Sequence, residues 1–160
     1  DDEIYGVELD AQFAVNDEIT LAGSYSYIDG KAGEITNPFT GLIDPSSREE
    51  LQGTPKNSVL MSINYDGDNG LFGNLSYSYK DSILSIPEND LRLPSVSLVN
   101  GRIGYNFDMA NGNEATIALW GTNLLDEEYL VDSLPFETFA YRTNVYGQPR
   151  SYGATLGVKF

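Results

Sequence analysis

Strict alternation of apolar and polar residues runs through most of this chain and constrains its fold more than any other feature. Successive side chains of a β-strand point to opposite faces, so this period of two predicts strands with one apolar and one polar face. The pattern is clear near residues 5–13, 19–27, 59–65, 71–80, 99–107, 114–124 and 151–160. We therefore expect an all-β fold, an antiparallel up-and-down meander of about seven strands.

The connections between these strands alternate between short and long. Short polar turns are predicted at 15–18, 66–70 and 108–113, and long loops at 29–55, 81–94 and 125–149. Tight periplasmic turns and longer extracellular loops are typical of transmembrane β-barrels. If the short turns are periplasmic, the last strand runs down to a periplasmic rim at Phe160.

Aromatic residues gather at both ends of the predicted apolar face, with Val, Leu, Ala, Ile and Met between them. Membrane barrels carry such aromatic girdles at the two interfaces, whereas a soluble sandwich core has no reason to sort its aromatics into two rows. A soluble all-β binding module remains the alternative. One row comprises Tyr5, Tyr25, Tyr27, Tyr77, Tyr79 and Tyr152, and the other Phe13, Tyr65, Tyr105, Phe107 and Phe160.

Composition excludes several functions. The chain has no cysteine and no histidine, which excludes thiolate metal sites, cysteine nucleophiles and histidine-based catalysis. Its net charge of −15 disfavours nucleic-acid binding, which depends on Lys and Arg. The acidic turn at Asp66–Gly70 lacks the calcium-binding glutamate of an EF-hand, because Tyr77 stands at the twelfth position. We expect no enzyme activity, no cofactor and no metal site.

Three motifs resemble TonB-dependent outer-membrane receptors of the siderophore type. The segment Gly121–Tyr129 (Gly-Thr-Asn-Leu-Leu-Asp-Glu-Glu-Tyr) is similar to the family's penultimate-strand motif, with Leu125 where the family usually has Phe. The segment Tyr146–Phe160, beginning Tyr-Gly-Gln-Pro-Arg, resembles the closing strand with its terminal aromatic. Gly53-Thr-Pro55 resembles a strand entry that is common in these receptors.

This resemblance implies that residues 1–160 are the C-terminal portion of a transmembrane barrel of about 22 strands, with the plug domain and N-terminal strands absent from the chain. It implies uptake of a scarce nutrient, most often a ferric siderophore, across the bacterial outer membrane. The TonB complex would act through the missing N-terminal part. A passive porin-type barrel is the alternative within the membrane class.

The third long loop carries the candidate ligand-binding residues Phe136, Phe139, Tyr141 and Arg142. Aromatic rings and a cation on an extracellular loop suit an aromatic or anionic ligand such as a ferric chelate. The competing interpretation is that these side chains only pack the loop against its neighbours.

The final strand is the candidate membrane-insertion signal, through Tyr152, Ala154, Leu156, Val158 and Phe160. Its pattern resembles the signal that the barrel-assembly machinery recognises, and deletion of Phe160 is expected to lower insertion. Outer-membrane lipid is the expected partner of the apolar face, and lipopolysaccharide, through divalent cations, of the acidic loops.

Overall fold

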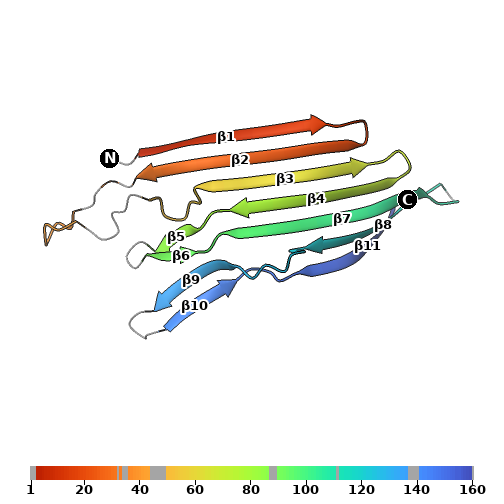
Figure 1. Ribbon diagram of the computed structural model, residues 1–160. Coiled ribbons are helices and arrows are strands. Elements are labelled where there is room, and N and C mark those ends of the chain that lie inside the picture. The colour runs from red at the N-terminus through yellow and green to blue at the C-terminus, as the bar shows by residue number, and fades with distance from the viewer. Residues whose placement is uncertain are drawn as a thin grey trace.

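The computed structural model shows one curved sheet with two small hairpins at one end (Figure 1). It describes residues 3–31, 33, 36–43, 50–86, 90–110, 112–136 and 141–159. Across these ranges, no helix is long and apolar enough to cross a membrane. The regular structure within them consists of strands.

Seven strands form the main sheet, and their order in the sheet is their order in the chain. Every neighbouring pair is antiparallel. The predicted all-β meander is therefore confirmed. The strands are β1 (Glu3–Ala14), β2 (Ile19–Lys31), β3 (Asn57–Asp66), β4 (Leu71–Lys80), β7 (Val96–Asp108), β8 (Glu114–Thr122) and β11 (Ser151–Lys159).

The short connections all lie at one end of the sheet, here called the turn end, and the long ones at the other, the loop end (Figure 1). The predicted turn at 66–70 is confirmed. The Gly67 N–H donates to the Leu71 carbonyl at 2.8 Å, and Gly70 has a φ of +88°, which favours glycine.

The loop end contains structure that the alternation does not indicate. Two segments predicted only as loops hold two-stranded hairpins, and β1 and β2 extend further than predicted, so that Glu3 pairs with Lys31. These strands are too short, or too polar on both faces, to show a period of two. The hairpins are β5 (Ile83–Ile86) with β6 (Leu91–Leu93), and β9 (Leu130–Phe136) with β10 (Tyr141–Tyr146).

The register places the predicted apolar residues on one face of the sheet, here called the apolar face, and β8 adds Ile117 and Leu119 to it. It is uncovered: Leu156 is 74% exposed, Phe13 64% and Leu119 60%. Soluble monomers rarely leave apolar patches of this extent in water. The face therefore requires an apolar surrounding.

The opposite, polar face uses aromatic rings to cover glycines on the neighbouring strand. Phe72 pairs with Gly104 and Trp120 with Gly153, and a Cβ on either glycine would collide with the ring opposite. Arg102 lies 5.5 Å from the centre of the Phe72 ring. Such ring-over-glycine pairs are a known means of holding register where a sheet bends.

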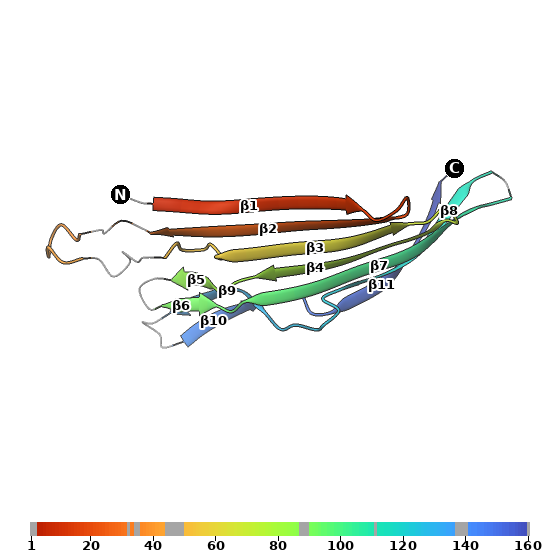
Figure 2. The ribbon, with the colours of Figure 1, turned by 45° about the horizontal axis from the view of Figure 1, so that its top comes forward.

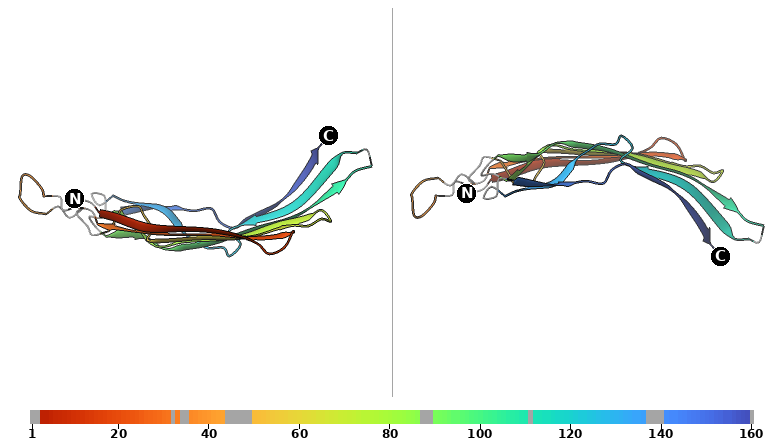
Figure 3. Two further views of the ribbon diagram at one scale, coloured as in Figure 1. Left: turned by 90° about the horizontal axis from the view of Figure 1, so that it is seen from above. Right: turned by 90° about the horizontal axis from the view of Figure 1, so that it is seen from below.

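The sheet bends as a barrel wall does. Strands β7, β8 and β11 curve away from the plane of β1 and β2 towards the turn end (Figures 2 and 3). Strands β1 and β11 form its two edges. The chain is thus a segment of a larger barrel and not a closed one.

Candidate functional site

The β9–β10 hairpin at the loop end brings two of the four predicted ligand-binding residues together. Phe136 and Tyr141 are directly paired, and their rings stack at a centroid distance of 4.9 Å and an interplanar angle of 22°. They are 39% and 54% exposed. The pair forms an aromatic surface that a planar or aromatic ligand can contact.

Of the other two predicted residues, the structure describes only Arg142, which does not join this pair. Arg142 pairs with Pro135, one position along the hairpin, and therefore lies on the opposite face. Phe139 lies outside the described residues. The predicted combination of rings and a cation on one surface is thus not formed by Arg142.

A small core supports this hairpin from the side. Strand β9 contacts β6, and Ser133 on β9 is buried, its hydroxyl donating to the Asn144 side-chain oxygen at 2.7 Å. The β5–β6 hairpin contributes the buried residues Leu84, Leu91 and Leu93. The two hairpins therefore form one body at the loop end (Figures 1 and 2).

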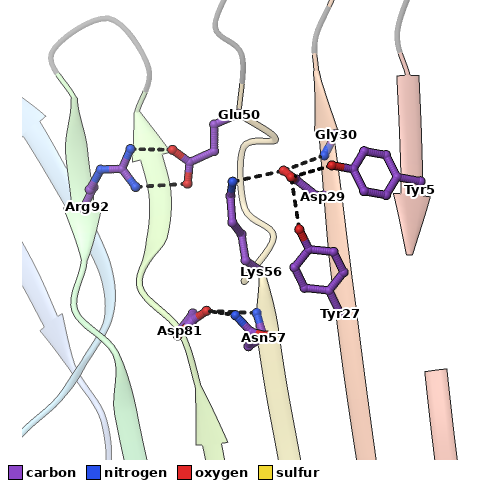
Figure 4. Close-up of polar contacts among 9 residues, drawn as sticks. All are labelled: Tyr5, Tyr27, Asp29, Gly30, Glu50, Lys56, Asn57, Asp81 and Arg92. Atoms are coloured by element: carbon purple, nitrogen blue, oxygen red, sulfur yellow. Dashed lines mark hydrogen bonds and ion pairs between the residues drawn. The ribbon is translucent and has the colours of Figure 1, made fainter. Parts of the chain in front are cut away.

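The first long loop is tied to the same body by an ion pair and two hydrogen bonds. The Arg92 guanidinium donates hydrogen bonds to both Glu50 carboxylate oxygens, one of them at 3.0 Å (Figure 4). The Gln52 side-chain amide donates to the Ser85 carbonyl at 2.6 Å, and the Gly53 N–H to the Leu84 carbonyl at 2.9 Å. The hydrogen bonds from Arg92 lower the pKa of Glu50.

A polar rim borders the apolar face at the loop end, centred on Asp29. This carboxylate accepts hydrogen bonds from the Tyr5 and Tyr27 hydroxyls at 2.9 and 3.2 Å and pairs with the Lys56 ammonium at 3.0 Å (Figure 4). The hydrogen bond to Asp29 raises the pKa of Lys56, which lies just outside β3.

The rim continues through Asn57 and Asp81. Asp81 accepts hydrogen bonds from the Asn57 side-chain amide at 2.6 Å and from the Tyr79 hydroxyl at 2.7 Å, and these lower its pKa. The Tyr25 hydroxyl donates to the Asn57 side-chain oxygen at 2.7 Å. Tyrosines with an apolar ring and a hydrogen-bonded hydroxyl are suited to a membrane–water interface.

Sequence reasoning identified these tyrosines but not their partners. A signal was present: Tyr27-x-Asp29 and Tyr79-x-Asp81 each place an acid two residues beyond a tyrosine at a strand end. Residues two apart share a face of a strand, so each acid falls beside its tyrosine.

The predicted insertion signal lies on the edge strand β11. Tyr152, Ala154, Leu156 and Val158 share the apolar face and pair with Gly121, Leu119, Ile117 and Ala115 of β8. Phe160 lies outside the described residues. In the described part of the chain, no group of three or more acidic side chains is arranged to hold a metal ion.

Comparison with known proteins identifies relatives over most of the chain. A family model described as "TonB dependent receptor-like, beta-barrel" matches residues 1–124. The ferrioxamine B receptor of Salmonella typhimurium is 26% identical over 151 residues, which are 91% of this chain and 20% of the receptor. The ferrichrome outer membrane transporter/phage receptor of Escherichia coli is 24% identical over 159 residues, 97% of this chain and 20% of that protein.

A solved structure shares the fold. The crystal structure of the ferric yersiniabactin uptake receptor of Yersinia pestis superposes with a TM-score of 0.77 at 18% identity, covering 99% of this chain and 24% of the receptor. The chain spans about a fifth of the length of the curated relatives it matches.

Proposed function

The chain belongs to the TonB-dependent receptor-like β-barrel family, and from this membership we propose that it forms part of a receptor that takes up a ferric siderophore. Its relatives are outer-membrane receptors of Gram-negative bacteria, and the outer membrane is where the chain resides. These relatives are transporters and receptors and not enzymes, which agrees with the prediction from the sequence. Family membership favours a receptor over a soluble binding module and over a passive porin.

The observation that carries the proposal is the combination of the family match with the uncovered apolar face. A sheet with one fully exposed apolar face is stable in lipid, provided that its edges are paired in a closed barrel. The tyrosine rim then lies at the outer interface, and the loop-end hairpins stand outside the membrane, where a ligand arrives.

We further propose that residues 1–160 are the C-terminal portion of a barrel of about 22 strands, in which a plug fills the lumen. The small share of its relatives that the chain covers supports its being part of a longer barrel, and the C-terminal placement rests on the resemblance of Tyr146–Phe160 to the family's closing strand. The plug and the TonB-contacting segment then belong to other parts of the protein. The TonB complex, the barrel-assembly machinery and lipopolysaccharide are its proposed partners.

The stacked Phe136–Tyr141 pair is the proposed ligand contact within this chain. Two of its relatives are named as receptors for ferrioxamine B and ferrichrome, so these two chelates are suitable probes. The pair offers exposed aromatic surface on the hairpin, and aromatic residues often dominate binding energy at interfaces.

Uptake of radiolabelled ferric chelates by cells that produce the complete receptor tests the proposed transport. Uptake that requires TonB supports it, and equal uptake with and without TonB contradicts it.

For the ligand contact, Phe136→Ala and Tyr141→Ala are each expected to weaken binding of the transported chelate on the order of tenfold, about 1.4 kcal/mol. Arg142→Ala, on the other face of the hairpin, is the matched control.

A further inference from the structure

Two sequence motifs that lie more than fifteen residues apart meet at the loop end of β8 and β11. We propose that contacts between residues 123–129 and 146–150, here called the register lock, fix the register in which β11 pairs with β8. The first segment follows β8 and the second precedes β11, so the β9–β10 hairpin emerges between them. The register lock can therefore fix the register of β11 independently of the conformation of the β9–β10 hairpin.

The two strands themselves specify their register weakly. Small residues dominate the paired positions, including Gly153, Ala154 and Gly157 on β11. A slip of two residues keeps every side chain on its own face, so alternation does not oppose it. Within the strands, the Trp120 ring over Gly153 is the clearest mark of the native register.

Asn123 is the centre of the lock. It is 4% exposed and has a positive φ of 50°, a conformation that asparagine adopts more readily than most residues. Its side-chain amide donates to the carbonyls of Glu127 at 2.9 Å and Gln148 at 3.2 Å, while its side-chain oxygen accepts the Glu127 N–H at 2.9 Å. One buried side chain therefore joins both segments.

Two further contacts fix the same alignment. The Asp126 carboxylate pairs with the Arg150 guanidinium at 3.1 Å, one residue before β11 begins. The Gly147 N–H donates to the Tyr129 carbonyl at 2.8 Å, and the Tyr129 ring occupies the space that a Cβ on Gly147 would need. Each contact would be lost if β11 moved by two residues.

Two hydrogen bonds also join the first segment of the register lock to β7. The Asn123 N–H donates to the Asn100 side-chain oxygen at 2.9 Å, and the Leu124 N–H to the Val99 carbonyl at 2.8 Å. The Leu124 side chain folds back over Gly101 and Gly121 on the apolar face. The first segment is therefore held by two strands, β7 and β8, before it meets the second.

The turn end has a weaker mark of register. Lys159 pairs with Glu114 at 3.1 Å, but both side chains are well exposed, and exposed ion pairs contribute little. The lock and the Trp120–Gly153 pair then supply most of the discrimination between registers. In a closed barrel the register between strands sets the shear of the whole wall, so an error at β11 would misplace the closing pair. Only this last step rests on the proposed C-terminal placement.

Cysteine cross-linking measures the register directly in the complete receptor in the outer membrane. Leu119→Cys with Ala154→Cys joins directly paired positions and reports the native register. Ile117→Cys with Ala154→Cys, and Leu119→Cys with Leu156→Cys, report slips of two residues in the two directions. Residues 1–160 contain no other cysteine.

With the lock intact, the native pair is expected to cross-link and the slipped pairs not. Asn123→Ala is expected to raise the ratio of slipped to native cross-links by on the order of fivefold or more, the factor that loss of one interaction of about 1 kcal/mol gives. Asn74→Ala removes an asparagine side-chain hydrogen bond away from β11, to Asn64 at 2.7 Å, and is the control. Native cross-links alone in Asn123→Ala would overturn the proposal.

A second variant keeps the test readable if Asn123→Ala does not assemble. Gly147→Ala drives the Tyr129 ring from its place and leaves the side-chain partners of Asn123 unchanged. Slipped cross-links above the parent level, reversed when Tyr129→Ala removes the ring from the same variant, support the lock. Normal assembly with native cross-links only contradicts it. These readouts do not involve transport, so failure of the lock and failure of the proposed uptake are distinguishable.

Discussion

Individual glycines on the polar face of β11 differ sharply in what surrounds them. A Cβ on Gly153 would lie 2.6 Å from the Trp120 ring, whereas one on Gly157 would meet Thr116 at 3.9 Å, an ordinary contact. Both positions lie on the same strand and the same face. The pair therefore separates the effect of a collision from the effect of losing a glycine.

Gly153→Ala is expected to destabilise the barrel by about 1–3 kcal/mol, because the indole must leave its preferred position. Gly157→Ala is expected to change stability by less than about 0.5 kcal/mol. Urea unfolding of the receptor in detergent, followed by tryptophan fluorescence, measures both. Equal effects of the two substitutions would show that Trp120 does not rest on Gly153.

The ion pair between Glu50 and Arg92 makes the loop-end body sensitive to acid. The pKa of Glu50 is lowered in the folded state, so its stabilising effect is present above the ordinary glutamate pKa and is lost as the pH falls through the lowered value. Hydrogen exchange at the Gly53 amide, which is bonded to Leu84, is expected to show opening that increases as the pH falls through this range.

Glu50→Gln is the control for this dependence, because an amide does not titrate. In that variant the opening at Gly53 should be greater than in the parent protein at neutral pH and should not depend on a carboxyl group. An identical pH dependence in both proteins would exclude Glu50 as its source.

Single strands carry the distinction between the two faces of the sheet. On β11, Leu156 lies on the apolar face and Thr155, its neighbour, on the polar face. Leu156→Arg is expected to cost about 2–4 kcal/mol if it lies near the bilayer midplane, while Thr155→Arg is expected to be tolerated. Folding of the complete receptor into lipid vesicles, followed by its electrophoretic shift, compares the two.

Assembly of the receptor in cells is expected to depend on Phe160. Deletion of Phe160 is expected to lower the amount of receptor inserted in the outer membrane, because its terminal aromatic resembles the signal read by the barrel-assembly machinery. Thr155→Ala, on the opposite face of β11 and outside the proposed signal, is the control. Normal insertion without Phe160 would contradict the proposed signal.

Elements with alternation were predictable, and those without it were not. The apolar residues of β3 or β11 recur at every second position, so both strands and their faces followed from the sequence. Strand β6 has three residues and is held by burial of Leu91 and Leu93 against other loops, a cause that no local pattern records. Similarly, the two C-terminal motifs were recognised separately, but their contact through Asn123 depends on the fold of both.

The candidate site shows the same division. Phe136 and Tyr141 were singled out by residue type, and the hairpin that stacks them was not foreseen. Arg142 was grouped with them as a cation on the same loop, although neighbouring residues of a strand point to opposite faces. The hairpin was needed to separate them.

At the scale of the whole molecule, the sheet is part of a barrel wall. Lipid is proposed on its apolar face and the barrel lumen on its polar face. Strand β3 crosses the middle of this wall and has both neighbours in place, with Met61 and Ile63 on the apolar face and Ser62 and Asn64 on the polar face. It is therefore the strand on which the two environments can be compared with the least disturbance.

Spin labels placed singly from position 59 to position 65 in the complete receptor, reconstituted in lipid, test this placement most directly. Accessibility to oxygen, which concentrates in lipid, is expected to be high at Val59, Met61, Ile63 and Tyr65, and accessibility to a water-soluble relaxant to be low there. The intervening positions are expected to show lower oxygen accessibility. Accessibility that does not alternate, or that is high to the water-soluble relaxant at Met61 and Ile63, would contradict a lipid-facing apolar surface.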